Sequence, residues 1–262
     1  MKSALVFLGV IISTFAIGQI RLSKLVLRPK QVYEIKGSDI LVVDSLIMQD
    51  SSRIILNKLK PENFIHAKVA VFYRGALIDG HGATGIPGRK GKPGNSPMSP
   101  CTNGAPGTMG TEGTNGGHGI NVSLYFSEIM MRGNVTIDVS GGAAGDGGEG
   151  GVGGGGGPGT RLCKGGNGGQ GGAGANGGNG GDAGSVNFVC PKIPELRLML
   201  GEKIIVRNYG GDRGIGGNGG AGGYSGLSAL QDSKMDGKPG RKGVKGSDGL
   251  AGKPGSVNFP EK

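Results

Sequence analysis

Residues 141–157 read GGAAGDGGEGGVGGGGG, and the pattern of these residues predicts how much of the chain folds. Glycine stands at every third position from Gly142 to Gly157, and in most triplets the preceding position is glycine as well. Three residues per turn is the period of the polyproline II helix, which has no internal hydrogen bonds. Its N–H and C=O groups can pair with neighbouring chains when bare glycine ridges let the backbones approach. The stretch therefore predicts a closely packed polyglycine II helix.

The same period extends outward on both sides of this stretch. Glycine triplets mark six arms, which are joined in pairs around short interruptions at 95–103, 158–164 and 227–236. Paired arms of matched length predict three antiparallel hairpins that pack together as a bundle. With 61 glycines among 262 residues and no tryptophan, the composition excludes an ordinary globular core.

Three other interpretations of the glycine tracts stand beside the bundle. A collagen triple helix also needs glycine at every third position, but the longest unbroken run has seven glycines, double glycines are common and proline totals 13. Glycine-rich chains are often flexible linkers, although a linker does not require paired arms of matched length. A calcium-binding glycine–aspartate repeat fits residues 177–182 once, without a tandem copy.

The segments between the glycine tracts are apolar and resemble one another. GALIDGHG at 75–82 matches GNVTIDVSGG at 133–142, and EKIIVRNYGG at 202–211 is a weaker third copy. Their β-branched residues alternate along the chain as in short strands. A serial repeat of this kind predicts the rungs of a parallel β-helix, with a β-sandwich as the alternative.

The expected chain is thus mainly β and irregular: a short parallel β-helix-like (or β-sandwich) scaffold carries three glycine-rich hairpins packed as a polyglycine II bundle. Hairpin 2 has 25 glycines in the 44 positions of 141–184. It therefore offers two bare ridges and is predicted to lie between the other two hairpins. The expected segments are a signal peptide 1–18, a lead-in or cap 19–37, scaffold units 38–80, 120–140 and 185–209, hairpins 81–119, 141–184 and 210–255, and a terminal strand 256–262.

The Gly-x-x and Gly-Gly-x arms between residues 82 and 255 resemble the polyglycine II bundles of springtail antifreeze proteins and of some phage tail-fibre adhesins. The resemblance rests on glycine periodicity and paired arms, and no side-chain signature supports it. The resemblance implies a packed bundle, but the proteins that this chain resembles have different functions. The apolar segments between the arms depart from the compact springtail proteins.

The chain carries a formal charge of +10, which falls to +9 when residues 1–18 are removed. Such a charge favours acidic partners such as an anionic surface glycan, lipid headgroups or nucleic acid. The basic residues gather on hairpins 1 and 3. We expect no specific nucleic-acid partner.

Catalytic motifs are not recognisable: there is no Ser-His-Asp arrangement, paired-cysteine metal spacing or phosphate loop. We therefore expect no enzymatic activity, no cofactor and no metal. His66, His81 and His118 lack the spacing of metal ligands. Asp79 and Asp138, stacked in adjacent rungs, would be the acid–base pair of an alternative, a polysaccharide-processing β-helix enzyme.

The favoured function is that of a secreted or cell-surface, non-catalytic structural protein or adhesin, whose turn loops contact a ligand. An ice-binding protein is the alternative, because Thr108, Thr111 and Thr114 lie on one ridge with a spacing of about 9.3 Å. The candidate contact residues in the turns are Ser96, Met98, Thr102, Arg161, Lys164, Gln231 and Lys234.

The cysteines agree with export. Cys101 and Cys163 lie in or beside the turns of consecutive hairpins, so we expect a disulfide between them in an oxidising compartment. Cys190 is then left over near the scaffold. Three unpaired thiols are the alternative.

Export itself is the first testable prediction. Lys2, the apolar run 4–17 and the small residues Ala16 and Gly18 follow the order of a secretory signal. No later apolar run is long enough to cross a membrane. Mass spectrometry of the secreted protein should find a chain that begins at or near Gln19, and an intact Met1 on exported protein would contradict this.

Overall fold

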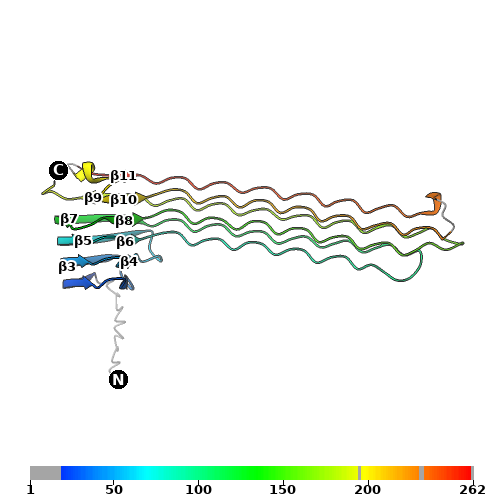
Figure 1. Ribbon diagram of the computed structural model, residues 1–262, viewed down its shortest axis with the longest axis horizontal. Coiled ribbons are helices and arrows are strands. Elements are labelled where there is room, and N and C mark those ends of the chain that lie inside the picture. Colours follow the sequence, from blue (N-terminus) through cyan, green and yellow to red (C-terminus); the bar gives the residue numbers. More distant parts are fainter. Residues whose placement is uncertain (1–18, 194–195, 230–232, 261–262) are drawn as a thin grey trace, which may run out of the picture.

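The computed structural model describes residues 19–193, 196–229 and 233–260, so the expected signal peptide 1–18 lies outside the described residues. A strand-rich scaffold stands at one end, and the long glycine-rich arms run away from it side by side (Figure 1). The chain is therefore mainly β and irregular, as the sequence predicts.

The scaffold is a coil with two parallel sheets. One sheet has the order β1-β3-β5-β7-β9-β11 and the other the order β10-β8-β6-β4-β2, so each turn of the chain adds one strand to each sheet. This serial order is that of a β-helix. The strands are β1 (Ile20–Leu27), β2 (Val32–Glu34), β3 (Ile40–Met48), β4 (Arg53–Ile55), β5 (Glu62–Phe72), β6 (Ala76–Asp79), β7 (Asn121–Met131), β8 (Val135–Asp138), β9 (Val186–Val189), β10 (Ile204–Arg207) and β11 (Val257–Asn258), with short 3-10 helices η1 (Leu196–Met199) and η2 (Ser233–Met235).

Two details of the coil go beyond the sequence prediction. Residues 19–37, expected as a lead-in or cap, contribute β1 and β2 and so form the first rung. Residues 40–43 and 46–48 belong to the single strand β3.

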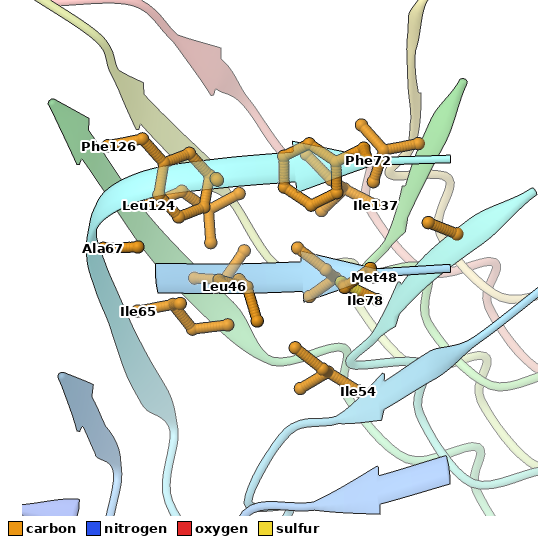
Figure 2. Packing of buried hydrophobic residues seen from close by; sticks show 14 of the residues in the cluster. Leu46, Met48, Ile54, Ile65, Ala67, Phe72, Ile78, Leu124, Phe126 and Ile137 are labelled. Carbon is orange, nitrogen blue, oxygen red and sulfur yellow. The ribbon is translucent and has the colours of Figure 1, made fainter. Parts of the chain in front are cut away.

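The core lies between the two sheets, where alternate side chains of each strand point inward (Figure 2). Leu46, Ile65 and Ile78 are completely buried. Aromatic rings from successive rungs stack along the coil, with centroid separations of 5.7, 5.5 and 6.3 Å between neighbours in the series Phe72, Phe126, Phe188 and Phe259.

Each hairpin forms a connection in the chain between a strand of one sheet and the next strand of the other sheet. Each leaves the end of a strand in the five-stranded sheet, β6, β8 or β10, and returns into a strand of the six-stranded sheet, β7, β9 or β11. The bundle therefore has two layers that continue the two sheets. The outgoing arms are 81–94, 141–157 and 210–226, and the returning arms are 104–119, 165–184 and 237–255.

Hairpin 2 lies in the middle of the bundle, as its glycine content predicts. In its outgoing arm, the Gly148 N–H donates to Thr111 O (2.9 Å) and the Gly147 N–H donates to Ile215 O (2.8 Å). The same arm accepts hydrogen bonds at Asp146 O from hairpin 1 (2.7 Å) and at Gly148 O from its own returning arm (2.9 Å). It thus bonds to four neighbouring arms, whereas the edge arms 81–94 and 237–255 bond to two.

The absence of side chains on two ridges is what permits these contacts. A Cβ atom added to Gly147 would lie 2.0 Å from Ala175 O, and one added to Gly148 would lie 2.0 Å from Arg89 O. The third residue of the triplet, Glu149, points its side chain outward and is exposed. The arms are therefore neither the flexible linkers nor the collagen triple helix of the alternatives.

Side chains satisfy many of the remaining backbone N–H groups. The Asn103 side-chain oxygen accepts the Asn167 N–H (2.8 Å), and the Asn167 oxygen accepts the Lys238 N–H (2.7 Å). The same relay across the returning arms recurs at Asn115, Asn179 and Leu250. These amides explain why asparagine is frequent at the outward positions of a packed glycine arm.

The predicted disulfide is present. Cys101 and Cys163 are bonded, with their Cα atoms 6.0 Å apart, and the bridge joins the turns of hairpins 1 and 2. The Cys101 N–H also donates to Pro158 O (2.8 Å) across the same junction. Cys190 is unpaired and buried beside the scaffold core, and this burial raises the pKa of its thiol.

Adjacent glycines allow a matched test of the bare-ridge argument. A Cβ at Gly154 would lie 2.1 Å from Asn95 O, whereas a Cβ at Gly155 meets nothing closer than Ser96 Oγ at 3.6 Å. We predict that Gly154→Ala lowers the melting temperature sharply, because each backbone group left unpaired costs about 1–3 kcal/mol. Gly155→Ala should change stability by less than about 1 kcal/mol. Thermal unfolding followed by circular dichroism measures both, and equal melting of the two variants would contradict the packing.

Removing the Cys101–Cys163 disulfide gives a second stability test. The bridge spans 62 residues, for which loop-closure entropy corresponds to roughly 4 kcal/mol of stabilisation. The double variant Cys101→Ser/Cys163→Ser should lose stability of that order in denaturant unfolding. Reductant should shift the parent in the same direction and leave the double variant unchanged. A parent protein that unfolds identically with and without reductant would exclude a stabilising role.

Candidate binding site at the tip of the bundle

The three turns that join the arms lie together at the end of the bundle farthest from the scaffold (Figure 1). They are the segments 95–103 and 158–164 and the described residues of 227–236. Six of the seven candidate contact residues are therefore brought to one end of the molecule. Gln231 lies outside the described residues.

The candidate residues in the turns have different roles in the structure. Ser96 Oγ accepts the Gly155 N–H (2.8 Å), and Thr102 Oγ1 donates to Ser99 O (2.5 Å), so both hydroxyls hold the turns in place. Met98, Arg161 and Lys164 are exposed. The turn of hairpin 2 is shaped by Thr160, whose hydroxyl accepts the backbone N–H groups of the two residues before Lys164.

Each turn also presents a large apolar side chain to solvent. Met98 in the first turn is 98% exposed, Leu162 in the second is 96% exposed and Leu227 in the third is 68% exposed. Only Met98 is among the residues that the sequence singles out. The signal for the other two is their position: an apolar residue in a turn without a strand or helix to bury it.

The charges divide along the bundle. A chain of hydrogen bonds defines one level across all six arms, through Arg89, Thr111, Gly148, Ala175, Gly217 and Gly246. The distal half, from this level to the turns, comprises 89–111, 148–175 and 217–246 and has ten basic and three acidic residues, a formal charge of +7. The proximal half of the arms, nearer the scaffold, has two basic and five acidic residues, a charge of −3.

The densest cationic segment lies on an edge arm. Lys238, Arg241, Lys242 and Lys245 are exposed on the returning arm of hairpin 3, next to its turn. The last of these cations, Lys245, forms an ion pair with Asp248 at 3.6 Å. A backbone hydrogen bond from Gly216, together with this lysine, lowers the pKa of the Asp248 carboxyl group. In the described part of the chain, no carboxylate forms an ion pair with the other three cations.

The threonine ladder has a structural role. Thr108, Thr111 and Thr114 accept hydrogen bonds through Oγ1 from the backbone N–H groups of Lys92, Arg89 and Ile86, at 2.6, 2.7 and 2.6 Å. These N–H groups belong to the outgoing arm of the same hairpin. The regular spacing of the threonines therefore follows from the spacing of the backbone groups that they cap.

Asp79 and Asp138 do stack as neighbours in β6 and β8. Each carboxylate lies beside an arginine, at 3.7 Å from Arg53 and 3.6 Å from Arg207 respectively. Asp79 also accepts the His81 N–H (3.1 Å), and Asp138 accepts bonds from the backbone and hydroxyl of Ser140. Both aspartates thus anchor the transition from a strand to a glycine arm.

The histidines are similarly dispersed. His81 Nδ1 contacts Ser140 Oγ (3.0 Å), and His118 Nδ1 accepts the Asp182 N–H (3.0 Å). His66 lies on the outer face of the six-stranded sheet, in a shallow hollow that it shares with Tyr125. Among the described residues, no group of histidine, cysteine or acidic side chains is arranged to hold a metal ion. The described part also contains no helix long and apolar enough to cross a membrane.

Comparison with known proteins adds little to this geometry. No model of a protein family and no curated protein matches the chain. Among solved structures, the nine polyproline type II helical bundle springtail antifreeze protein from Granisotoma rainieri is 26% identical over 62% of this chain and 94% of its own, with a TM-score of 0.11. This match is weak, and the two structures superpose poorly.

Proposed function

We propose that the protein is a non-catalytic surface protein of the adhesin type, in which the glycine bundle holds three turns away from the scaffold for contact with a ligand. The observation that carries this proposal is the gathering of all three turns at one end of a packed bundle. An arm of 17 residues in polyproline II geometry reaches about 50 Å. Such a reach suits presentation of a contact surface at a distance.

The construction of the rod supports this role. Every arm is bonded to at least two others through backbone groups, so bending one arm requires hydrogen bonds to break in its neighbours. The disulfide ties two turns together at the tip. Disulfides persist in oxidising compartments, which agrees with an exported protein. The aspartate pair of the enzyme alternative is occupied by arginines and backbone groups, which favours a structural role for it.

A binding panel with matched variants tests which end of the molecule makes contact. The probes are immobilised anionic and neutral polysaccharides and supported layers of anionic and neutral phospholipid. The tip variant is Arg161→Ser/Lys164→Ser, and the scaffold control is Arg21→Ser/Lys24→Ser, which removes two exposed cations from β1. On any anionic surface that retains the parent protein, we expect the tip variant to bind at least about tenfold more weakly, because each cation near an anionic surface contributes about 1 kcal/mol.

The control should bind as the parent does. Equal loss in both variants, or loss in the scaffold variant alone, would rule out the tip as the contact end. Retention of the parent by none of the probes would also count against the proposal, because an adhesin for anionic surfaces should hold at least one of them.

A further inference from the structure

The tip of the bundle combines exposed apolar side chains with basic ones. Met98, Leu162 and Leu227 place one exposed apolar side chain on each turn. Large apolar side chains gathered at one exposed place mark interaction sites. Their ligand must therefore offer apolar surface to all three turns.

Cations lie beside two of these apolar residues. Arg161 and Lys164 both lie in the turn of hairpin 2, on either side of Leu162, and Lys238 begins the returning arm of hairpin 3 directly behind its turn. Arg89 and Lys92 lie on the opposite edge arm of the bundle, so that both edges of the distal half are basic. The ligand must therefore be anionic as well as partly apolar.

An anionic lipid bilayer has both properties, with the apolar layer beneath the charged headgroups. Apolar side chains enter the boundary between headgroups and acyl chains, while basic side chains just outside it pair with the phosphates. A polysaccharide or nucleic-acid backbone provides the charge but no apolar layer. Nucleic-acid bases stack on aromatic rings, and the described residues of the distal half contain a single aromatic residue, Tyr224.

We propose that the bundle docks end-on to an anionic lipid surface, with Met98, Leu162 and Leu227 entering the headgroup region and Arg161, Lys164 and Lys238 bound to phosphates. This inference rests on the proposed function, since it takes the tip as the contact end. End-on docking also requires that cations far from the tip contribute little to binding. Lys245 lies seven residues farther along the arm than Lys238, about 22 Å in this helix, which is well beyond the screening length of about 8 Å at physiological salt.

Co-sedimentation with vesicles tests the proposal. The probes are vesicles of phosphatidylcholine mixed with phosphatidylglycerol, vesicles of phosphatidylcholine alone, and dextran sulfate as a polyanion without lipid. The parent should bind the mixed vesicles, release them as salt is raised and ignore the neutral ones. Lys164→Gln/Lys238→Gln should weaken binding about 25-fold, because each cation at the surface is worth about 1 kcal/mol, or roughly fivefold.

The apolar residues give the decisive comparison. Met98→Ser/Leu162→Ser should abolish vesicle binding and leave any binding to dextran sulfate unchanged. Leu250→Ser and Lys253→Gln are matched controls, since both residues are exposed on the same edge arm near the scaffold, and neither should matter. Lys245→Gln should cost less than twofold. Melting temperatures of all variants confirm that they are folded.

Three outcomes would overturn end-on lipid docking: binding to dextran sulfate without binding to vesicles, no effect of Met98→Ser/Leu162→Ser on vesicle binding, or an effect of Lys245→Gln as large as that of Lys238→Gln. In the first case the proposed function survives if the tip variant of the polysaccharide panel still loses binding. The last outcome would instead indicate a polyanion lying lengthwise along the edge arm.

Discussion

The whole bundle depends on one constraint: a polyproline II helix cannot satisfy its own backbone, so every N–H and C=O group must find a partner in another arm, in a side chain or in water. Neighbouring arms approach closely enough only where both lack a Cβ at the contact. At Gly148 a methyl group would lie 2.0 Å from a carbonyl oxygen of the next arm. In hairpin 2, side chains larger than alanine are therefore confined to the outward position of each triplet, and the interior of the bundle is almost entirely main chain.

The scaffold solves the problem of bringing six such arms into register. Separate glycine helices would have to lose their freedom one by one, and a glycine-rich chain has more conformational entropy to lose than any other. Here the strands β6, β8 and β10 deliver the outgoing arms already side by side, and β7, β9 and β11 receive the returning ones. The apolar core of the coil, with its stacked phenylalanines, thus supplies the stability that aligns the glycine-rich arms.

Much of this arrangement could be predicted from the sequence, because glycine period, repeat and cysteine position are local patterns. The period predicts the arms, the glycine content of 141–184 predicts the middle hairpin, and the position of Cys101 and Cys163 in consecutive turns predicts their bond. The division of charge along the bundle could not be predicted. It depends on which residues share a level, and Arg89 and Gly246, on opposite edges of the bundle, share one only through the register of the four intervening arms. Leu162 and Leu227 were missed for a related reason, since apolar residues in a glycine-rich turn carry no periodicity.

The register between hairpins restricts how such a molecule can change in length. The side-chain contacts between hairpins 1 and 2 join residues 59 apart in the outgoing arms, as in His81 and Ser140 or Ser96 and Gly155, and 64 apart in the returning arms, as in Asn115 and Asn179. An insertion of one residue in a single arm would turn every later glycine of that arm away from its contact. Whole triplets must instead be added to both arms of all three hairpins at once. The length of the bundle can therefore change only in steps of one helical turn, made in all six arms together.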